Sequence, residues 1–237
     1  MKITIFGSGS MWNENNSASH LIDDDILVDI PNGCCKNLFK LGIGPKKVNN
    51  ILITHFHGDH YFDMPFYFLQ KTKDIESVVS IFCDKEGKKK IKKLFKLAFP
   101  NSVEDIYNEL KLNYVFSSKF NVGKYEVEKV LVDHGRMKPA FGYIFSFEDK
   151  CVGFTGDTSL CDNVKMMASK CDYLICDCMF IEGTPKHMGI DNLTQISKMY
   201  PKCKFVVSHL ENDTRSLLIE KNIKNVIVPK DGQVINI

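Results

Sequence analysis

The densest group of chemically active side chains in the 237-residue chain lies in one short segment, Thr54-His55-Phe56-His57-Gly58-Asp59-His60. Side chains of an extended segment alternate between two sides, so His55 and His57 face the same way and can hold one cation. Gly58 permits a sharp turn, after which Asp59 and His60 can face a second cation. The alternative is a loop with three solvent-exposed histidines, which the residues downstream disfavour.

Three further candidate ligands, His134, Asp157 and His209, each follow an apolar stretch typical of a strand. Strand ends at one edge of a sheet converge, and α/β proteins usually assemble their sites there. Taken singly, a histidine at a strand end is more often a structural residue, and Gly156-Asp157-Thr158 fits a simple turn. Taken in order after the first segment, the three residues indicate one metal site.

This ordered series resembles the ligand series of the metallo-β-lactamase superfamily, and within it the ribonuclease Z and small phosphodiesterase branch. The likeness extends to the loop Phe6-Gly7-Ser8-Gly9-Ser10 and to Ser208-His209. It implies an α/β fold, the four-layer αββα sandwich, as a single hydrolase domain over residues 1–237. It also implies two divalent metal ions. The implied ligands are His55, His57 and His134 for the first, Asp59, His60 and His209 for the second, and Asp157 for both.

The nitrogen and oxygen ligands of this set suit Zn²⁺ first, with Mn²⁺ or Fe²⁺ as alternatives. Water shared between two such cations loses a proton near neutral pH, and the resulting hydroxide can attack phosphorus. Asp59 can orient this hydroxide or accept its proton. Asp29 and Thr54 are candidates for fixing the imidazoles, although Asp29 fits a plain turn residue equally well.

A further histidine, His187, precedes a predicted helix and is not needed for either metal. The resemblance pairs it with Asp177 and gives it contact with the scissile phosphate or proton donation to the leaving oxygen. Both residues are therefore catalytic candidates. Asp177 stands where the family usually has the longer Glu, and a helix-capping or surface histidine is the alternative for His187.

The spacing of His134 and Asp157 bears on the substrate, because only 22 residues separate them. Ribonuclease Z enzymes that grip tRNA usually carry an extended arm in this interval. We therefore expect a phosphodiesterase for a small anionic diester such as a cyclic nucleotide. The alternatives are a ribonuclease Z-like endonuclease for tRNA 3′ processing, a thioester or lactone hydrolase, and a metal-stabilised binding module without activity.

The segment Lys85–Lys96 is the strongest signal for another partner. On a helix, Ile91, Leu94 and Phe95 form one apolar stripe and lysines cover the rest. Such helices are mostly solvated faces, and the alternative is a nucleic-acid contact surface with salt-dependent binding. The net charge of +2, from 31 basic and 29 acidic residues, argues against a dedicated nucleic-acid binder. The resemblance also suggests a homodimer.

The apolar runs and cysteines indicate the compartment. No stretch approaches the eighteen apolar residues of a membrane span, and the N-terminal run is too short for a signal peptide, so we expect a cytoplasmic protein without membrane association. The nine cysteines are an odd number in a long chain, which predicts reduced, mostly buried thiols. A thiolate metal site at Cys176 and Cys178 is the alternative.

The elements that must position these residues follow from periodicity, and an early group of strands followed by alternating strands and helices predicts helix-covered sheets. Strands are expected at 2–6, 20–22, 26–29, 51–54, 78–82, 125–132, 141–147, 151–155, 173–176, 205–207 and 226–228. Helices are expected at 34–41, 85–98, 103–110, 193–199 and 214–221.

Overall fold

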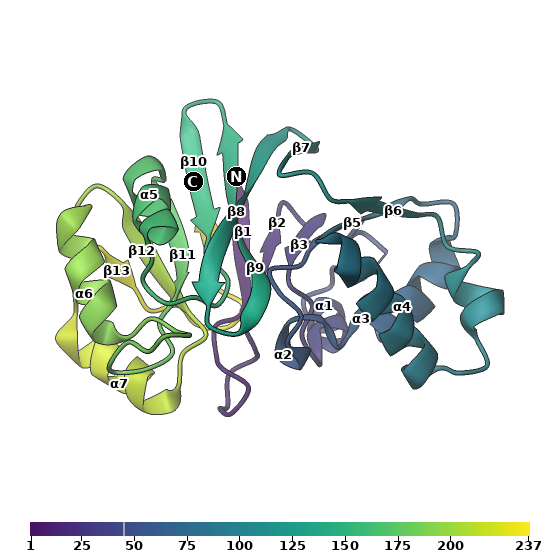
Figure 1. Cartoon of the computed structure of the whole chain (residues 1–237), viewed down its shortest axis with the longest axis horizontal. Helices are drawn as coiled ribbons and strands as arrows, with labels where there is room; N and C mark the ends of the chain where they lie inside the picture. The colour runs from purple at the N-terminus through teal and green to yellow at the C-terminus, as the bar shows by residue number, and fades with distance from the viewer. Residues whose placement is uncertain (45) are drawn as a thin grey trace. The chain divides into compact units, whose positions relative to one another are not determined.

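A computed structural model describes residues 1–44 and 46–237, and the chain forms two compact units, each built around its own sheet (Figure 1). The first unit comprises Met1–Phe6, Ser19–Phe116 and Val234–Ile237, and the second comprises Gly7–Ala18 and Ser117–Gln233. The expectation of a single domain stays a prediction.

The first unit contains a seven-stranded mixed sheet in the order β14-β1-β2-β3-β4-β5-β6. Its strands β3 to β6 run parallel, so their carboxyl ends lie at the same edge, where Asp29 and the histidine segment emerge after β3 and β4. The strands are β1 (Lys2–Gly7), β2 (Ser19–Ile22), β3 (Ile26–Val28), β4 (Asn50–Leu52), β5 (Val79–Phe82), β6 (Leu112–Val115) and β14 (Val234–Asn236).

Helices and aromatic side chains complete the first unit. Phe68, Phe95 and Tyr107 pack together, with ring centroids 5.5 to 6.0 Å apart. The Asp84 carboxylate accepts a hydrogen bond from the Gly87 amide and so caps α4, a contact worth about 1 kcal/mol. The helices are α1 (Cys34–Lys40), α2 (Gly58–Tyr61), α3 (Met64–Lys71), α4 (Lys85–Ala98), a 3₁₀ turn η1 (Thr72–Asp74) and a π-helical turn η2 (Val103–Tyr107).

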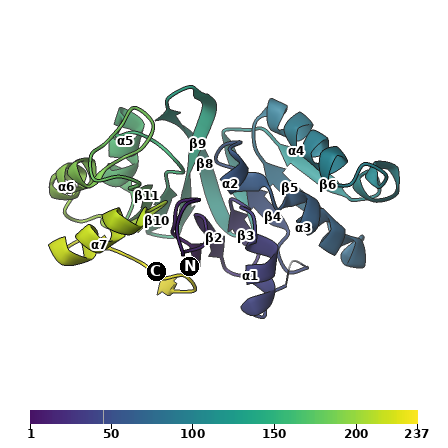
Figure 2. The same cartoon turned by 90° about the horizontal axis from the view of Figure 1, so that it is seen from below.

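The second unit contains another seven-stranded mixed sheet, in the order β13-β12-β11-β10-β9-β8-β7. Strands β10 to β13 run parallel, and β7 to β10 are antiparallel. Figure 2 shows α5, α6 and α7 along the parallel part of this sheet. The elements are β7 (Lys119–Val122), β8 (Tyr125–His134), β9 (Met137–Phe147), β10 (Lys150–Phe154), β11 (Tyr173–Asp177), β12 (Lys204–Ser208), β13 (Val226–Ile227), α5 (Asp162–Lys170), α6 (Ile190–Met199) and α7 (Asn212–Lys221).

Helix-flanked mixed sheets confirm the predicted α/β class. The helix predicted at 85–98 is confirmed with the same ends, and most other predicted elements differ by one to three residues. The sequence patterns missed α2, α3, α5, β6, β7 and β14. Among the residues that the structure describes, no helix is both long and apolar enough to span a membrane.

Candidate metal centre

The first unit gathers the histidine segment at the carboxyl end of β4. The Nε2 atom of His55 lies 3.0 Å from the Nδ1 atom of His57, and the Nε2 atom of His60 lies 3.7 Å from the nearer oxygen of Asp59. Ligands bound to one cation at about 2.1 Å are separated from each other by roughly 3.0 to 3.5 Å. The His55 and His57 nitrogens therefore have the spacing of two ligands of one ion.

Asp29 fixes the orientation of this segment. Its buried carboxylate accepts hydrogen bonds from the Thr54 amide at 2.8 Å, the Thr54 hydroxyl at 2.7 Å and the His60 Nδ1 atom at 2.8 Å. With Nδ1 donating to Asp29, the Nε2 atom of His60 is left as the metal-binding nitrogen. Burial raises the pKa of Asp29, and the nearby His60 opposes that rise. The Thr54 hydroxyl also lies 3.1 Å from the His55 Nδ1 atom, so the predicted contacts of Asp29 and Thr54 with an imidazole are both present.

Gly58 lies where the backbone changes direction after His57. The backbone passes from an extended conformation at His57 directly into α2, which begins at Gly58, and the φ angle of Gly58 is not positive. A Cβ atom at this position would lie 2.7 Å from the ring of Phe62. The chain therefore turns at Gly58, as predicted, without a positive φ angle, and a larger residue here would have to displace the Phe62 ring.

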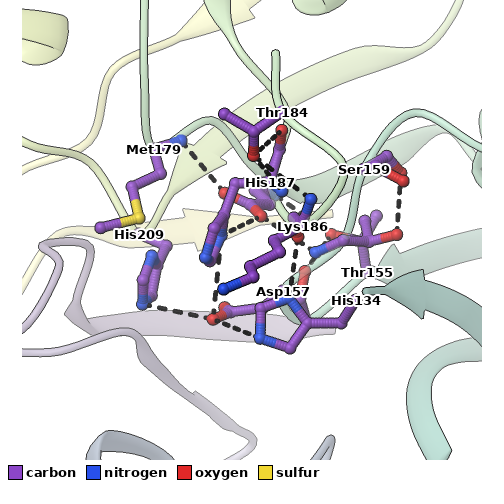
Figure 3. Close-up of polar contacts among 12 residues, drawn as sticks. His134, Thr155, Asp157, Ser159, Met179, Thr184, Lys186, His187 and His209 are labelled. Carbon is purple, nitrogen blue, oxygen red and sulfur yellow. Dashed lines mark hydrogen bonds and ion pairs between the residues drawn. The ribbon is translucent and has the colours of Figure 1, made fainter. Parts of the chain in front are cut away.

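The second unit brings together the three candidate ligands that the sequence separates most widely, His134, Asp157 and His209. Figure 3 shows the Asp157 carboxylate facing His134, His187 and His209. Its Oδ2 atom lies 3.4 Å from the Nε2 atom of His209, 3.9 Å from the Nε2 atom of His134 and 4.0 Å from the Nδ1 atom of His187. A carboxylate with imidazoles on several sides is suited to being a shared metal ligand.

The ends of three strands of the second unit supply these candidate ligands. His134 ends β8 after an irregularity in the pairing with β9, and its Nδ1 atom donates to the Lys186 carbonyl at 2.8 Å, which directs Nε2 toward Asp157. Gly156, with φ of 61°, makes the turn before Asp157. His209 follows β12 with φ of 58°, a left-handed conformation that is uncommon for a non-glycine residue.

His187 and Asp177 form the predicted pair. The His187 Nδ1 atom lies 2.9 Å from Asp177 Oδ2, and Asp177 also accepts hydrogen bonds from the amides of Thr158 at 2.9 Å and Met179 at 3.0 Å. The His187 ring stacks on the His209 ring, with centroids 5.3 Å apart and planes 9° from parallel. Pairing is therefore confirmed, and the catalytic role of both residues stays a prediction.

Burial sets the charge state of these groups. It lowers the pKa of His134, an effect that Asp157 opposes, so this imidazole is favoured in the neutral form that binds metals. Burial raises the pKa of Asp177, and the hydrogen bond with His187 acts against it. Neutral imidazoles together with negatively charged carboxylates suit a dication, because the carboxylates offset its positive charge.

The candidate donors are all nitrogen and oxygen atoms. In the second unit, Asp157, His187 and His209 each offer one ligand atom, and these atoms lie within 4.8 Å of one another. Within residues 1–44 and 46–237, no cysteine belongs to such a group. Burial raises the pKa of the Cys176 and Cys178 thiols, which disfavours thiolates, so the alternative thiolate site is not supported. Sequence reasoning missed the Lys186 carbonyl, because a main-chain contact leaves no residue-type signal.

Comparison with solved structures identifies the fold. The chain superimposes on a diphosphatase of the PhnP family with a TM-score of 0.79 at 18% identity, covering 100% of this chain and 97% of that one. For the metallo-β-lactamase fold protein YhfI of Bacillus subtilis the TM-score is 0.78 at 16% identity, covering 99% and 98%. For the short form of human tRNase Z it is 0.76 at 18% identity, covering 100% and 99%. The protein therefore has the metallo-β-lactamase fold.

Sequence comparison finds similarity to individual ribonuclease Z proteins and to one family model. Ribonuclease Z of Pyrococcus abyssi is 32% identical over 138 residues, which cover 53% of this chain and 39% of that protein. Ribonuclease Z of Thermococcus sibiricus is 23% identical over 229 residues, covering 73% and 72%. The matched region is about two fifths of the length of the first of these relatives. The family model described as anti-Pycsar protein Apyc1 matches residues 1–231.

Proposed function

The chain belongs to the anti-Pycsar Apyc1 family, and from this premise we propose that it is a metal-dependent phosphodiesterase that hydrolyses a small diester such as a cyclic nucleotide. One observation carries the proposal. The buried Asp157 carboxylate faces three imidazoles, and Asp177 orients one of these, His187. This arrangement provides metal ligands and a separate proton donor in one cluster.

The ligand set in this proposal is the one that the family resemblance implies, in which Asp157 is assigned to both ions. Two bound divalent cations, Zn²⁺ by preference, would lower the pKa of a water molecule and stabilise negative charge on the phosphoryl group. The residues that would hold the first ion are His55, His57 and His134, and those that would hold the second are Asp59, His60 and His209.

The side chains have distinct roles in the proposed reaction. Asp59 accepts a proton from the attacking water. His187, whose Nδ1 atom is engaged by Asp177, uses Nε2 to contact the scissile phosphate and protonate the leaving oxygen. Asp177 is a positioning residue, because its contacts with two backbone amides hold the carboxylate against the imidazole.

The interval between His134 and Asp157 supports a small substrate. It is occupied by the antiparallel strands β9 and β10 and a two-residue turn between them, Glu148-Asp149, so that this stretch forms part of the sheet. No arm of the type used to grip tRNA extends from these described residues. A compact diester is therefore favoured over a tRNA precursor.

The direct test is turnover by the full chain after metal removal and reconstitution with Zn²⁺ or Mn²⁺. We expect metal-dependent hydrolysis of bis(p-nitrophenyl) phosphate and of at least one cyclic nucleotide. The exposed variants Asp105→Asn and Glu220→Gln serve as controls with unchanged activity. A metal-loaded protein that is inert on every phosphodiester, yet hydrolyses a thioester or lactone, contradicts the proposal in favour of the alternative hydrolase.

The lysines of helix α4 are the feature that favours nucleic acid as an alternative substrate. Six of its lysines are exposed, and Glu86 is the one acidic residue of the helix. However, the ammonium groups of Lys88, Lys90 and Lys92 lie over rings of the same unit, 4.8 to 5.5 Å from the centroids. Because these lysines already contact rings of their own unit, we interpret α4 as a solvent-facing helix and not as a nucleic-acid contact surface. RNA binding that weakens steeply with salt and is lost in Lys89→Ala/Lys93→Ala would favour the alternative.

A further inference from the structure

Two thiols meet at the end of β10 opposite to Asp157. The Sγ atoms of Cys151 and Cys171 are 3.3 Å apart. Cys151 is the second residue of β10, and Cys171 lies between α5 and β11. Asp172 holds the two chain segments together, because its amide donates to the Cys151 carbonyl at 2.8 Å and its carboxylate accepts from the Cys151 amide at 2.9 Å.

Gly153 makes room for this contact. Residues two apart on a strand face the same side, so Cys151 and Gly153 share a face. A Cβ atom at Gly153 would lie 3.1 Å from the Cys171 Sγ atom and 2.6 Å from a methyl group of Leu174. The Cys171 thiol thus lies over a strand position without a side chain, next to Cys151.

The two thiols differ in acidity and exposure. The pKa of Cys151 is lowered by the hydrogen bond with the Cys171 thiol and, to a smaller extent, by the Ser146 hydroxyl, while burial opposes this. The pKa of Cys171 is raised by the same thiol contact and by burial. Cys151 is half-buried and Cys171 is buried. Cys151 is therefore the nucleophile that solvent can reach, and Cys171 keeps its proton.

We propose that Cys151 and Cys171 are an oxidation site, forming a reversible disulfide when the protein meets a peroxide. The Cys151 thiolate attacks one peroxide oxygen, the O–O bond breaks, and sulfenic acid and hydroxide are formed. The Cys171 sulfur then attacks the Cys151 sulfur, so that the S–S bond forms and the S–O bond breaks. The oxygen leaves as water with the Cys171 proton, so two thiols are oxidised and one peroxide is reduced. An external dithiol reverses the bond.

The disulfide would close a loop from residue 151 to residue 171 that contains β10, the Asp157 turn and α5. Cross-linking restricts the unfolded chain, so the bond stabilises the fold and raises Tm by about 5 to 10 °C. Asp157 follows the opposite end of β10, and the thiols already touch in the reduced protein. Turnover by the metal site is therefore expected to change less than about twofold.

The test uses the full chain treated with hydrogen peroxide, alkylated, and digested without reduction. We expect a peptide cross-linked between Cys151 and Cys171, two hydrogens lighter than the separate peptides, and a higher Tm that returns to its first value with dithiothreitol. Both signals are lost in Cys151→Ser and Cys171→Ser. They persist in Cys161→Ser, the control for another half-buried thiol of the same unit.

Two outcomes overturn the proposal. One is a folded protein in which both thiols remain alkylatable after peroxide, and the other is a cross-link of Cys151 to Cys203 in place of Cys171. Neither readout depends on hydrolysis, so a protein without phosphodiesterase activity would leave this test intact. If Cys171→Ser folds poorly, Cys151→Ser, at a half-buried position, carries the comparison alone.

Discussion

The two units supply candidate ligands in opposite ways. In the first unit the ligands are contiguous, since His55 to His60 occupy one loop and the start of a four-residue helix. In the second unit His134, Asp157 and His209 come from three strand ends, separated by successive intervals of 23 and 52 positions in the sequence, and they become neighbours through the sheet. The position of the candidate ligands therefore depends on local backbone conformation in the first unit and on strand register in the second.

The groups that orient the imidazoles differ as well. In the first unit a side chain, Asp29, holds His60. In the second unit a main-chain carbonyl, Lys186, holds His134, and a side chain, Asp177, holds His187. We expect substitutions of orienting side chains to affect metal binding in the first unit and proton transfer in the second.

The largest effect is expected for removal of a proposed metal ligand. His57→Ala and Asp157→Ala should each lower kcat/KM for bis(p-nitrophenyl) phosphate by about three orders of magnitude. The double variant should lose little more than either single variant, because ligands of one centre act as a unit. Losses that multiply in the double variant would instead mean two independent sites.

A smaller effect separates the orienting carboxylates. Asp29→Asn should weaken metal binding about 10- to 100-fold, because the amide no longer accepts from His60 as a carboxylate does. Asp177→Asn should retain the metal and lower kcat about 100-fold. Chelator competition measures the first quantity and turnover at saturating metal the second. If Asp29→Asn and Asp177→Asn lost metal equally, the two carboxylates would not differ in role as proposed.

The smallest effect concerns His20, a buried histidine of the first unit outside the predicted ligand set. Burial, with a contribution from His60, lowers its pKa from 6.5 to about 3. Between these values the unfolded chain binds more protons, so His20 makes stability fall as the pH drops from 6.5 toward 3, by at most about 1.4 kcal/mol per pH unit. Urea unfolding of the metal-free protein between pH 7 and 5 measures this effect. The free energy of unfolding should depend less steeply on pH in His20→Gln than in the unchanged protein, and equal pH dependence in the two would contradict this assignment.

Features that depend on local sequence could be predicted, whereas contacts between distant segments could not. The α/β class and the α4 helix were predictable from periodicity, and the spacing of the histidine segment predicted ligands that face together. Helix α3 was missed because Met64–Leu69 is apolar at every position, so no polar side defines a face. The contact of Cys151 with Cys171 and the hydrogen bond from His134 to Lys186 were not predictable, because each joins segments that meet only through the sheet.

The left-handed backbone of His209 has an evolutionary consequence. A non-glycine residue with φ of 58° costs the fold about 1 kcal/mol relative to glycine, and here the cost is accepted at a position that directs an imidazole toward Asp157. Stability and chemistry therefore favour different residues at this position. Laboratory evolution that selects only for heat resistance should drift toward glycine or asparagine at position 209, and the presence of histidine in natural variants would report continuing selection for the site.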